Sequence, residues 1–239
     1  MRAEAERLRD AGDGGAAAPG DGLAAVLWDM DGTLVTSEEA WLEVEHEVMD
    51  RLGGPWGPEH QAALVGGALP ASVRYMLDLS GSDEDPAVVG EWLVEGMARR
   101  LAAGPVAWMP GAQELLEALR AEGVPTALVS ASYRVLIDAV LTALGPGLFD
   151  TTVAGDEVTE GKPHPEAYLT AAARLGAPPA RCVVLEDSPN GSRAGLAAGC
   201  PVVAVPSVAP VPPARGLLVV DSLTGVDPAR LRALVPARA

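Results

Sequence analysis

Short continuous apolar runs recur along the chain and predict buried β-strands. The runs cover residues 23–28, 124–129, 182–185, 202–205 and 217–220, with a weaker one at 151–154. Unbroken apolarity, rather than alternation with polar residues, is typical of strands that are covered on both faces, as in parallel sheets.

Amphipathic helical patterns lie between several of these runs, at residues 112–121, 133–144 and 166–175. The third pattern follows two prolines and stops at Gly176, which are common helix start and stop signals. Strands that alternate with helices favour right-handed crossovers. The sequence therefore predicts an α/β fold with a doubly wound parallel sheet.

The strand pattern disappears between Ser37 and Pro110, and helical patterns replace it. They cover residues 38–52, 70–79 and 86–103. The first of these helices is strongly acidic, and the simplest interpretation of its charges is a solvated helix face.

This change of pattern predicts a division of the chain into domains. We expect a small helical domain at 38–109, inserted into a core domain that comprises 22–37 and 110–239. Residues 1–21 are rich in Gly, Ala and Asp, without an apolar period. They predict a disordered leader.

The composition excludes several classes of protein. The 239 residues include 33 acidic and 17 basic ones, and the formal net charge of −16 disfavours nucleic acid as a partner. The two cysteines have no metal-ligand spacing. Apolar runs fall short of the roughly 18 residues that cross a bilayer, and no secretory signal is visible. We expect a cytoplasmic monomer or homodimer that binds no membrane.

The first predicted strand ends in two carboxylates, Asp29 and Asp31. In an open α/β sheet, ligands bind beyond the carboxyl ends of the strands. Two neighbouring carboxylates repel each other unless a divalent cation or a shared proton offsets their charge. Gly32 allows a sharp turn there, and we expect the Thr33 hydroxyl to hold a neighbouring carboxylate.

Three further segments carry candidate chemistry. Ser130 and Ala131 follow the second strand at a helix start, which suits an anion such as phosphate. Lys162, the single lysine of the chain, would supply a fixed positive charge, and Glu186-Asp187 form a second acidic pair at a strand end. Oxygen ligands of this kind select Mg²⁺.

Together these segments resemble the four motifs of the haloacid dehalogenase (HAD) superfamily. The motifs LWDMDGTL, VSAS, GKPHPE and VLEDSPNG occur in the family's order, and the resemblance covers roughly residues 23–225. The chain is most similar to the branch with a helical cap, which includes β-phosphoglucomutase-like and phosphoglycolate phosphatase-like enzymes. The resemblance implies a Rossmann-like core with a helical cap domain.

The resemblance also implies catalytic roles. Asp29 would be the nucleophile that forms an aspartyl phosphate, and Asp31 the general acid and then the base. Ser130 and Lys162 would hold the phosphoryl oxygens.

Further roles follow from the same resemblance. The backbone N–H groups of Met30, Asp31 and Ala131 would be additional donors to the phosphoryl group. Mg²⁺ would bind the Asp29 carboxylate, the Asp31 carbonyl and Asp187, with Glu186 assisting directly or through water.

The insert differs from the mutase pattern of the family. β-Phosphoglucomutases grip a second phosphate with basic cap residues, whereas the comparable stretch 64–69 carries none. The sequence therefore favours an Mg²⁺-dependent phosphomonoester phosphatase acting on a small metabolite such as a sugar or polyol phosphate. A phosphosugar mutase is one alternative, and a catalytically idle phosphate-sensing protein is another.

Overall fold

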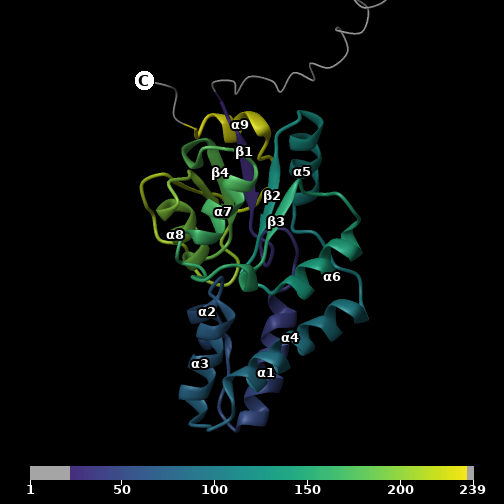
Figure 1. Ribbon diagram of the computed structural model, residues 1–239, viewed down its shortest axis with the longest axis vertical. Helices are drawn as coiled ribbons and strands as arrows, with labels where there is room; N and C mark the ends of the chain where they lie inside the picture. The colour runs from purple at the N-terminus through teal and green to yellow at the C-terminus, as the bar shows by residue number, and fades with distance from the viewer. Residues whose placement is uncertain (1–21, 236–239) are drawn as a thin grey trace, which may run out of the picture.

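The computed structural model describes residues 22–235 and contains a six-stranded parallel sheet (Figure 1). The strand order is β3-β2-β1-β4-β5-β6. The strands are β1 (Ala25–Trp28), β2 (Thr126–Val129), β3 (Thr151–Val153), β4 (Cys182–Glu186), β5 (Val202–Ala204) and β6 (Leu217–Val219). The predicted fold class is thereby confirmed, while the predicted leader at 1–21 lies outside the described residues.

Helices cover both faces of the sheet. They are α5 (Ala112–Ala121), α6 (Arg134–Leu144), α7 (Glu166–Arg174), α8 (Pro189–Ala197) and α9 (Pro228–Arg232). Val26 and Trp28 of β1 pack into one apolar layer with α5, α6 and α9, whereas Leu27 packs into the other with α7 and α8. Because successive strand residues point to opposite faces, this arrangement explains the unbroken apolar runs.

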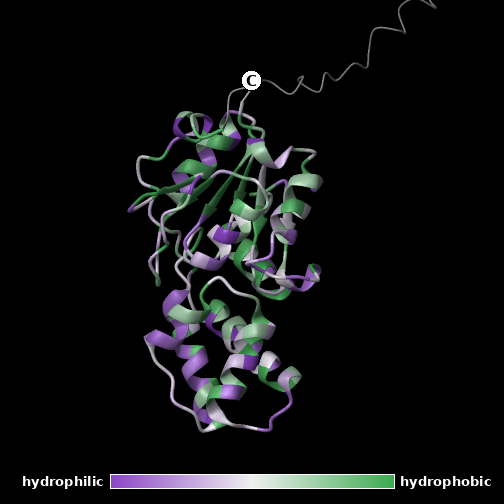
Figure 2. Ribbon diagram, turned by 90° about the vertical axis from the view of Figure 1, so that its left-hand side faces the viewer, coloured by the Kyte–Doolittle hydropathy of each residue, from purple (hydrophilic) through white to green (hydrophobic). Residues whose placement is uncertain are grey.

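Four helices lie together beyond the carboxyl ends of the strands, and we call them the cap helices (Figure 1). They are α1 (Glu38–Leu52), α2 (Pro58–Leu64), α3 (Leu69–Ser80) and α4 (Pro86–Ala103). Val44, Met76 and Leu93 belong to their own apolar cluster, which Leu136 of α6 joins. Hydrophilic residues alternate with hydrophobic ones along these helices, while the sheet strands are mostly hydrophobic (Figure 2).

Two adjacent linkers connect the cap helices to the sheet. The Thr36 N–H donates to the Ala107 carbonyl at 2.9 Å, and the Met109 N–H donates to the Leu34 carbonyl at 2.9 Å. The two linkers are thus hydrogen-bonded to each other between the sheet and the cap helices. The exact domain boundaries at 37/38 and 109/110 remain a prediction.

The sequence patterns did not predict two of the helices. α2 has seven residues and α8 begins Pro-Asn-Gly, so neither shows a clear apolar period. Both begin with proline, and in α8 the Ser188 hydroxyl accepts a hydrogen bond from the Gly191 N–H at 3.0 Å. Within the described residues, none of the helices is both long and apolar enough to cross a bilayer.

Candidate active site

The strand register brings the predicted motifs to one edge of the sheet. Trp28 lies opposite Leu128 of β2 and Leu185 of β4, so Asp29 and Glu186 reach the same level. The Asp29 N–H also donates to the Leu185 carbonyl at 3.0 Å. The strand order changes direction between β1 and β4, and this switch point is where open α/β sheets bind ligands.

The buried Lys162 ammonium connects three of these segments. Its Nζ donates to Asp29 Oδ1 at 2.6 Å, to Glu186 Oε1 at 2.7 Å and to the Val129 carbonyl at 3.0 Å. It also lies 4.9 Å from the centre of the Tyr168 ring. With three partners around it and only 3% of its surface exposed, the ammonium is held in a fixed position beside Asp29.

Glu186 uses both carboxylate oxygens within the protein. Oε1 accepts from Lys162 and from the Tyr168 hydroxyl at 2.7 Å, while Oε2 accepts from the Ser188 hydroxyl at 2.9 Å. A side chain at Gly191 would collide with this carboxylate, so glycine is required there. Glu186 therefore fits a role in positioning Lys162 better than a role as a direct metal ligand.

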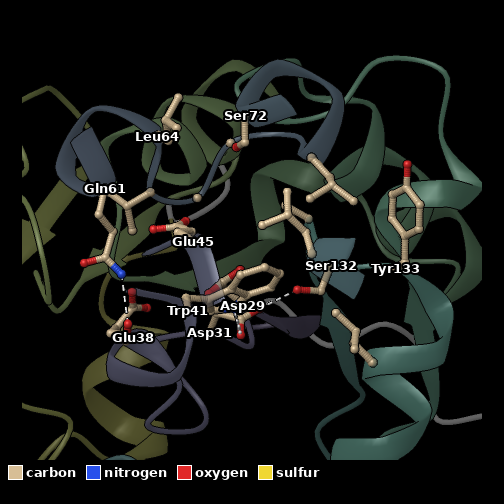
Figure 3. Close-up of a pocket in the computed structure, with 17 residues that line it drawn as sticks. Asp29, Asp31, Glu38, Trp41, Glu45, Gln61, Leu64, Ser72, Ser132 and Tyr133 are labelled. Carbon is tan, nitrogen blue, oxygen red and sulfur yellow. Dashed lines mark hydrogen bonds between the residues drawn. The ribbon is translucent and has the colours of Figure 1, made fainter. Parts of the chain in front are cut away.

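Hydrogen bonds from two directions hold the Asp31 carboxylate. Ser37 Oγ, just before α1, donates to Asp31 Oδ1 at 2.7 Å. Trp41 Nε1, within α1, donates to the same oxygen at 2.9 Å. Ser132 Oγ and Ser130 Oγ, after β2, donate to Oδ2 at 2.8 and 3.3 Å. The predicted general acid is thus connected both to the sheet and to the cap helices (Figure 3).

The carboxylates near β1 and β4 form a set of oxygen ligands that fits a hard cation. Oxygens of Asp29, Glu186 and Asp187 lie within 4.8 Å of one another. A Cβ built on Gly32, whose φ is +76°, would collide with the Asp187 and Glu38 carboxylates, so the glycine keeps this space open. Glu38 Oε1 is buried without a hydrogen-bond partner among the described residues. Because Lys162, Tyr168 and Ser188 already use the Glu186 oxygens, Asp29 and Asp187 are the carboxylates of this set that suit Mg²⁺ as direct ligands.

Burial and mutual repulsion perturb this cluster of acids. Burial, with the Glu186 charge, raises the pKa of Asp29 to about 8, although Lys162 opposes the shift. Burial, with the Asp31 and Asp29 charges, raises the pKa of Glu38 to about 8, and the pKa of Asp187 is raised for similar reasons.

The same carboxylates also change the pKa of Lys162. Burial alone would lower the pKa of Lys162, but the carboxylates of Asp29 and Glu186 outweigh burial and raise it. Lys162 therefore stays protonated. A single ammonium cannot offset this many carboxylates, so the site is electrostatically suited to a divalent cation.

The remaining predicted residues also lie at this edge. The Met30 side chain is buried, and its carbonyl accepts from the Leu34 N–H at 2.9 Å in the turn after β1. Ala131 lines the cavity described below. The Thr33 hydroxyl is buried without a partner among the described residues, so the expected bond to a carboxylate is not seen. Ser130 has its hydroxyl directed at Asp31, and phosphate binding by it stays a prediction.

A cavity extends from Asp29 and Asp31 toward the cap helices (Figure 3). Its wall includes residues with polar side-chain atoms, namely Trp41, Glu45, Gln61, Ser72 and Tyr133, and the leucines at 64, 69, 93 and 136.

Sequence reasoning missed these polar wall residues. The interpretation of the acidic helix as a solvated face is wrong for Glu45, which is 8% exposed, and for the buried Oε1 of Glu38. Their positions seven residues apart on α1 were the available signal, since this spacing places both on one face.

Comparisons with known proteins show the family of the chain. A family model described as haloacid dehalogenase-like hydrolase matches residues 23–199. Protein CbbY of Rhodobacter capsulatus is 33% identical over 195 residues, covering 77% of this chain and 86% of the relative. Hexitol phosphatase A of Escherichia coli is 34% identical over 193 residues, covering 78% of this chain and 84% of the relative.

A solved structure is also similar. The CbbY D10N mutant of Rhodobacter sphaeroides, in complex with xylulose-(1,5)bisphosphate, superposes with a TM-score of 0.78 and 28% identity. The match covers 87% of this chain and 99% of that one.

Proposed function

Because the chain belongs to the haloacid dehalogenase-like hydrolases, we propose that it is an Mg²⁺-dependent phosphatase that hydrolyses small phosphomonoesters. The observation that carries the proposal is the Asp29 carboxylate, which is fixed by Lys162 Nζ at 2.6 Å and lines one cavity together with Asp31. A nucleophile, an acid and a fixed cation thus converge on one point.

In the proposed reaction, Asp29 attacks the phosphorus atom in line with the ester oxygen. The P–O bond to the leaving group breaks, its electron pair goes to the alkoxide, and Asp31 gives that oxygen a proton. Asp31 then takes a proton from water as the water attacks phosphorus. Inorganic phosphate leaves, and the Asp29 carboxylate and the Asp31 acid are regenerated.

The other residues provide charge and position. Lys162 and the backbone N–H groups after β1 and β2 would stabilise the phosphoryl oxygens. Asp29, the Asp31 carbonyl and Asp187 would hold Mg²⁺, which when bound offsets the charge of the carboxylates and the ester. Glu186 would keep the lysine in place.

The class of substrate follows from the cavity and the relatives. One relative is named as a hexitol phosphatase, and a similar structure holds a pentulose bisphosphate. Together with the polar wall of the cavity, these names support a sugar or polyol phosphate as substrate. A mutase would need a cation for the second phosphate, and none of the described residues that line the cavity is basic. We further propose a cytoplasmic location and a monomeric or homodimeric state.

A screen of phosphorylated metabolites with Mg²⁺, measuring released phosphate, tests this function. Hydrolysis should need the metal, and Asp29→Asn should abolish it. Asp83→Asn removes an exposed carboxylate between α3 and α4 and should leave the rate unchanged. The proposal fails if the Asp29 variant keeps most of its activity, or if the product is an isomerised phosphosugar rather than free phosphate.

A further inference from the structure

The far wall of the cavity contains a carboxylate in a fixed position. Glu45 lies on the inner side of α1 and is 8% exposed, although it faces the cavity (Figure 3). Trp56 Nε1 donates to its Oε2 at 3.1 Å, and the Trp56 ring stacks on His60 with 5.2 Å between ring centres. Among the described residues, no second donor binds this carboxylate, so Oε1 is free to accept hydrogen bonds from a ligand.

The amide of Gln61 lies near it on the same wall. Gln61 is 6% exposed, and its Nε2 donates to the Glu38 carbonyl at 2.8 Å, which fixes the orientation of the amide. The amide oxygen is then left without a protein donor among the described residues. The Ser72 hydroxyl of α3 lines the same cavity. These groups offer mainly acceptors, which match the hydroxyl donors of a polyol.

The ionisable side chains on the cavity wall are all acidic among the described residues. Glu38 and Glu45 face the cavity, and among the described residues none of its lining side chains is Lys, Arg or His. A carboxylate or second phosphate on the leaving group would lose its hydrating water in the cavity. It would also lie close to acidic side chains without a cation to compensate its charge. Like charges in such a position cost several kcal/mol.

The arginines of the cap helices do not supply that cation. Arg100 pairs with Glu43 and Glu47 on the partly exposed side of α1, and Arg99 lies 3.6 Å from Glu47. Arg51 lies over the Trp92 ring, 5.2 Å from its centre, and Arg74 lines a neighbouring hollow between α3 and α4 rather than the cavity itself.

We propose that Glu45 determines specificity by accepting hydrogen bonds from hydroxyl groups at the far end of an uncharged, polyhydroxylated leaving group, and by rejecting substrates with a second anionic group there. The proposal rests on the proposed function, because it assigns the leaving-group half of the same site. The apolar leucine surface would contact the carbon backbone of such a ligand.

Two substrates that differ at a single carbon test the proposal. Sorbitol 6-phosphate ends in CH₂OH, where 6-phosphogluconate has a carboxylate. Burial raises the pKa of Glu45 to about 7, so the comparison is made near pH 9, where this carboxylate is ionised. Wild-type protein should then show a kcat/KM at least about 100-fold higher for sorbitol 6-phosphate, as expected for several kcal/mol of repulsion. Hexyl phosphate, which lacks hydroxyls, should also be poorer by about tenfold or more. The inference would be overturned if kcat/KM for sorbitol 6-phosphate equalled that for 6-phosphogluconate or that for hexyl phosphate.

Variants assign the preference to the carboxylate. Glu45→Gln keeps the shape but removes the charge, so the preference over 6-phosphogluconate should fall about tenfold while KM for sorbitol 6-phosphate rises. Trp56→Phe removes the donor that fixes Glu45 and should raise the same KM. Glu39→Gln removes an exposed charge from the same helix and should leave the preference unchanged. An unchanged preference in Glu45→Gln would contradict the assignment.

Binding measurements separate this proposal from the proposed function. Calorimetry with the Asp29→Asn protein and Mg²⁺ should show tighter binding of sorbitol 6-phosphate than of 6-phosphogluconate without any turnover. If the Asp29→Asn protein binds sorbitol 6-phosphate more tightly but the wild-type protein hydrolyses no phosphate ester, the proposed function is overturned and the inference about Glu45 is kept. Hydrolysis without preference would overturn the inference alone.

Discussion

Lys162 shows how one residue connects separate parts of the chain. Its ammonium satisfies Asp29, Glu186 and the Val129 carbonyl in a space that is almost closed to solvent. A compact ammonium with three donors suits these three acceptors, whereas the planar fork of arginine does not have the same geometry.

We therefore predict that Lys162→Arg will not restore function. Lys162→Met should lower kcat for an aryl phosphate by about 10³-fold or more, because the fixed charge near the phosphoryl oxygens is lost. Lys162→Arg should lower it nearly as much, since the larger group displaces Asp29. Circular dichroism would confirm that both variants fold. An arginine variant with more than a tenth of wild-type kcat would contradict this account.

At the same scale, the sequence was informative about strand ends and uninformative about the cap. Asp29 and Asp187 could be placed because motifs at the ends of parallel strands meet at one edge, whereas Lys162 lies in the loop before α7 and was placed by the family resemblance alone. The spacing of Glu38 and Glu45 indicated a shared helix face, but their burial could not be predicted, because a charged helix position becomes buried only when other elements, here Trp56 and α2, pack over it. The partners of Glu186 depend likewise on Tyr168, which no strand motif contains.

At the scale of elements, the loop between α2 and α3 contacts the start of α8. Asn190 Nδ2 donates to the Val65 carbonyl at 2.9 Å, and Arg193 donates to Asn190 Oδ1 at 2.6 Å, which orients the amide. A Cβ on Gly66, whose φ is +70°, would collide with Ser188. The cap helices are thus held against the sheet directly over the site.

We predict that loosening this contact will weaken substrate binding. Asn190→Ala removes the hydrogen bond and Gly66→Ala introduces a clash, so both should raise KM several-fold more than they lower kcat. Steady-state kinetics with the best substrate measure the effect, and Gln113→Ala on the exposed side of α5 is the control. Values of KM unchanged in both variants would show that the contact does not control access to the site.

The sequence predicted some helices accurately and missed others. The bounds predicted for the first and last cap helices and for α5 match the structure residue for residue, because each of these helices packs one continuous face. The short α2 and the glycine-rich α8 are helical chiefly because proline starts them and neighbouring elements hold them. The family prediction is confirmed by the family model that matches residues 23–199.

At the scale of the whole molecule, the buried acids make stability depend on pH. Burial raises the pKa of Glu45 to about 7, with the Trp56 hydrogen bond opposing the shift, from an ordinary value of 4.5. Below pH 4.5 the residue is protonated in both the folded and the unfolded protein. As pH rises toward 7, the unfolded chain ionises first, so the folded state loses stability.

We predict that Glu45→Gln will flatten this pH dependence. Between pH 4.5 and pH 8, the free energy of unfolding of the wild type should fall by on the order of 3 kcal/mol more than that of Glu45→Gln. Urea denaturation in EDTA at several pH values measures the difference, and Glu39→Gln should follow the wild type. Parallel curves for wild type and Glu45→Gln would show that Glu45 ionises normally in the folded protein.

The central claim is that Asp29 accepts a phosphoryl group, and trapping that group tests it most directly. Wild-type protein would be mixed with its best substrate and Mg²⁺, quenched in acid within milliseconds, reduced with borohydride and analysed by peptide mass spectrometry. The account predicts homoserine, the reduction product of an aspartyl phosphate, at position 29, and none when EDTA replaces Mg²⁺. Hydrolysis that proceeds with the phosphoryl group trapped on a different residue would contradict it.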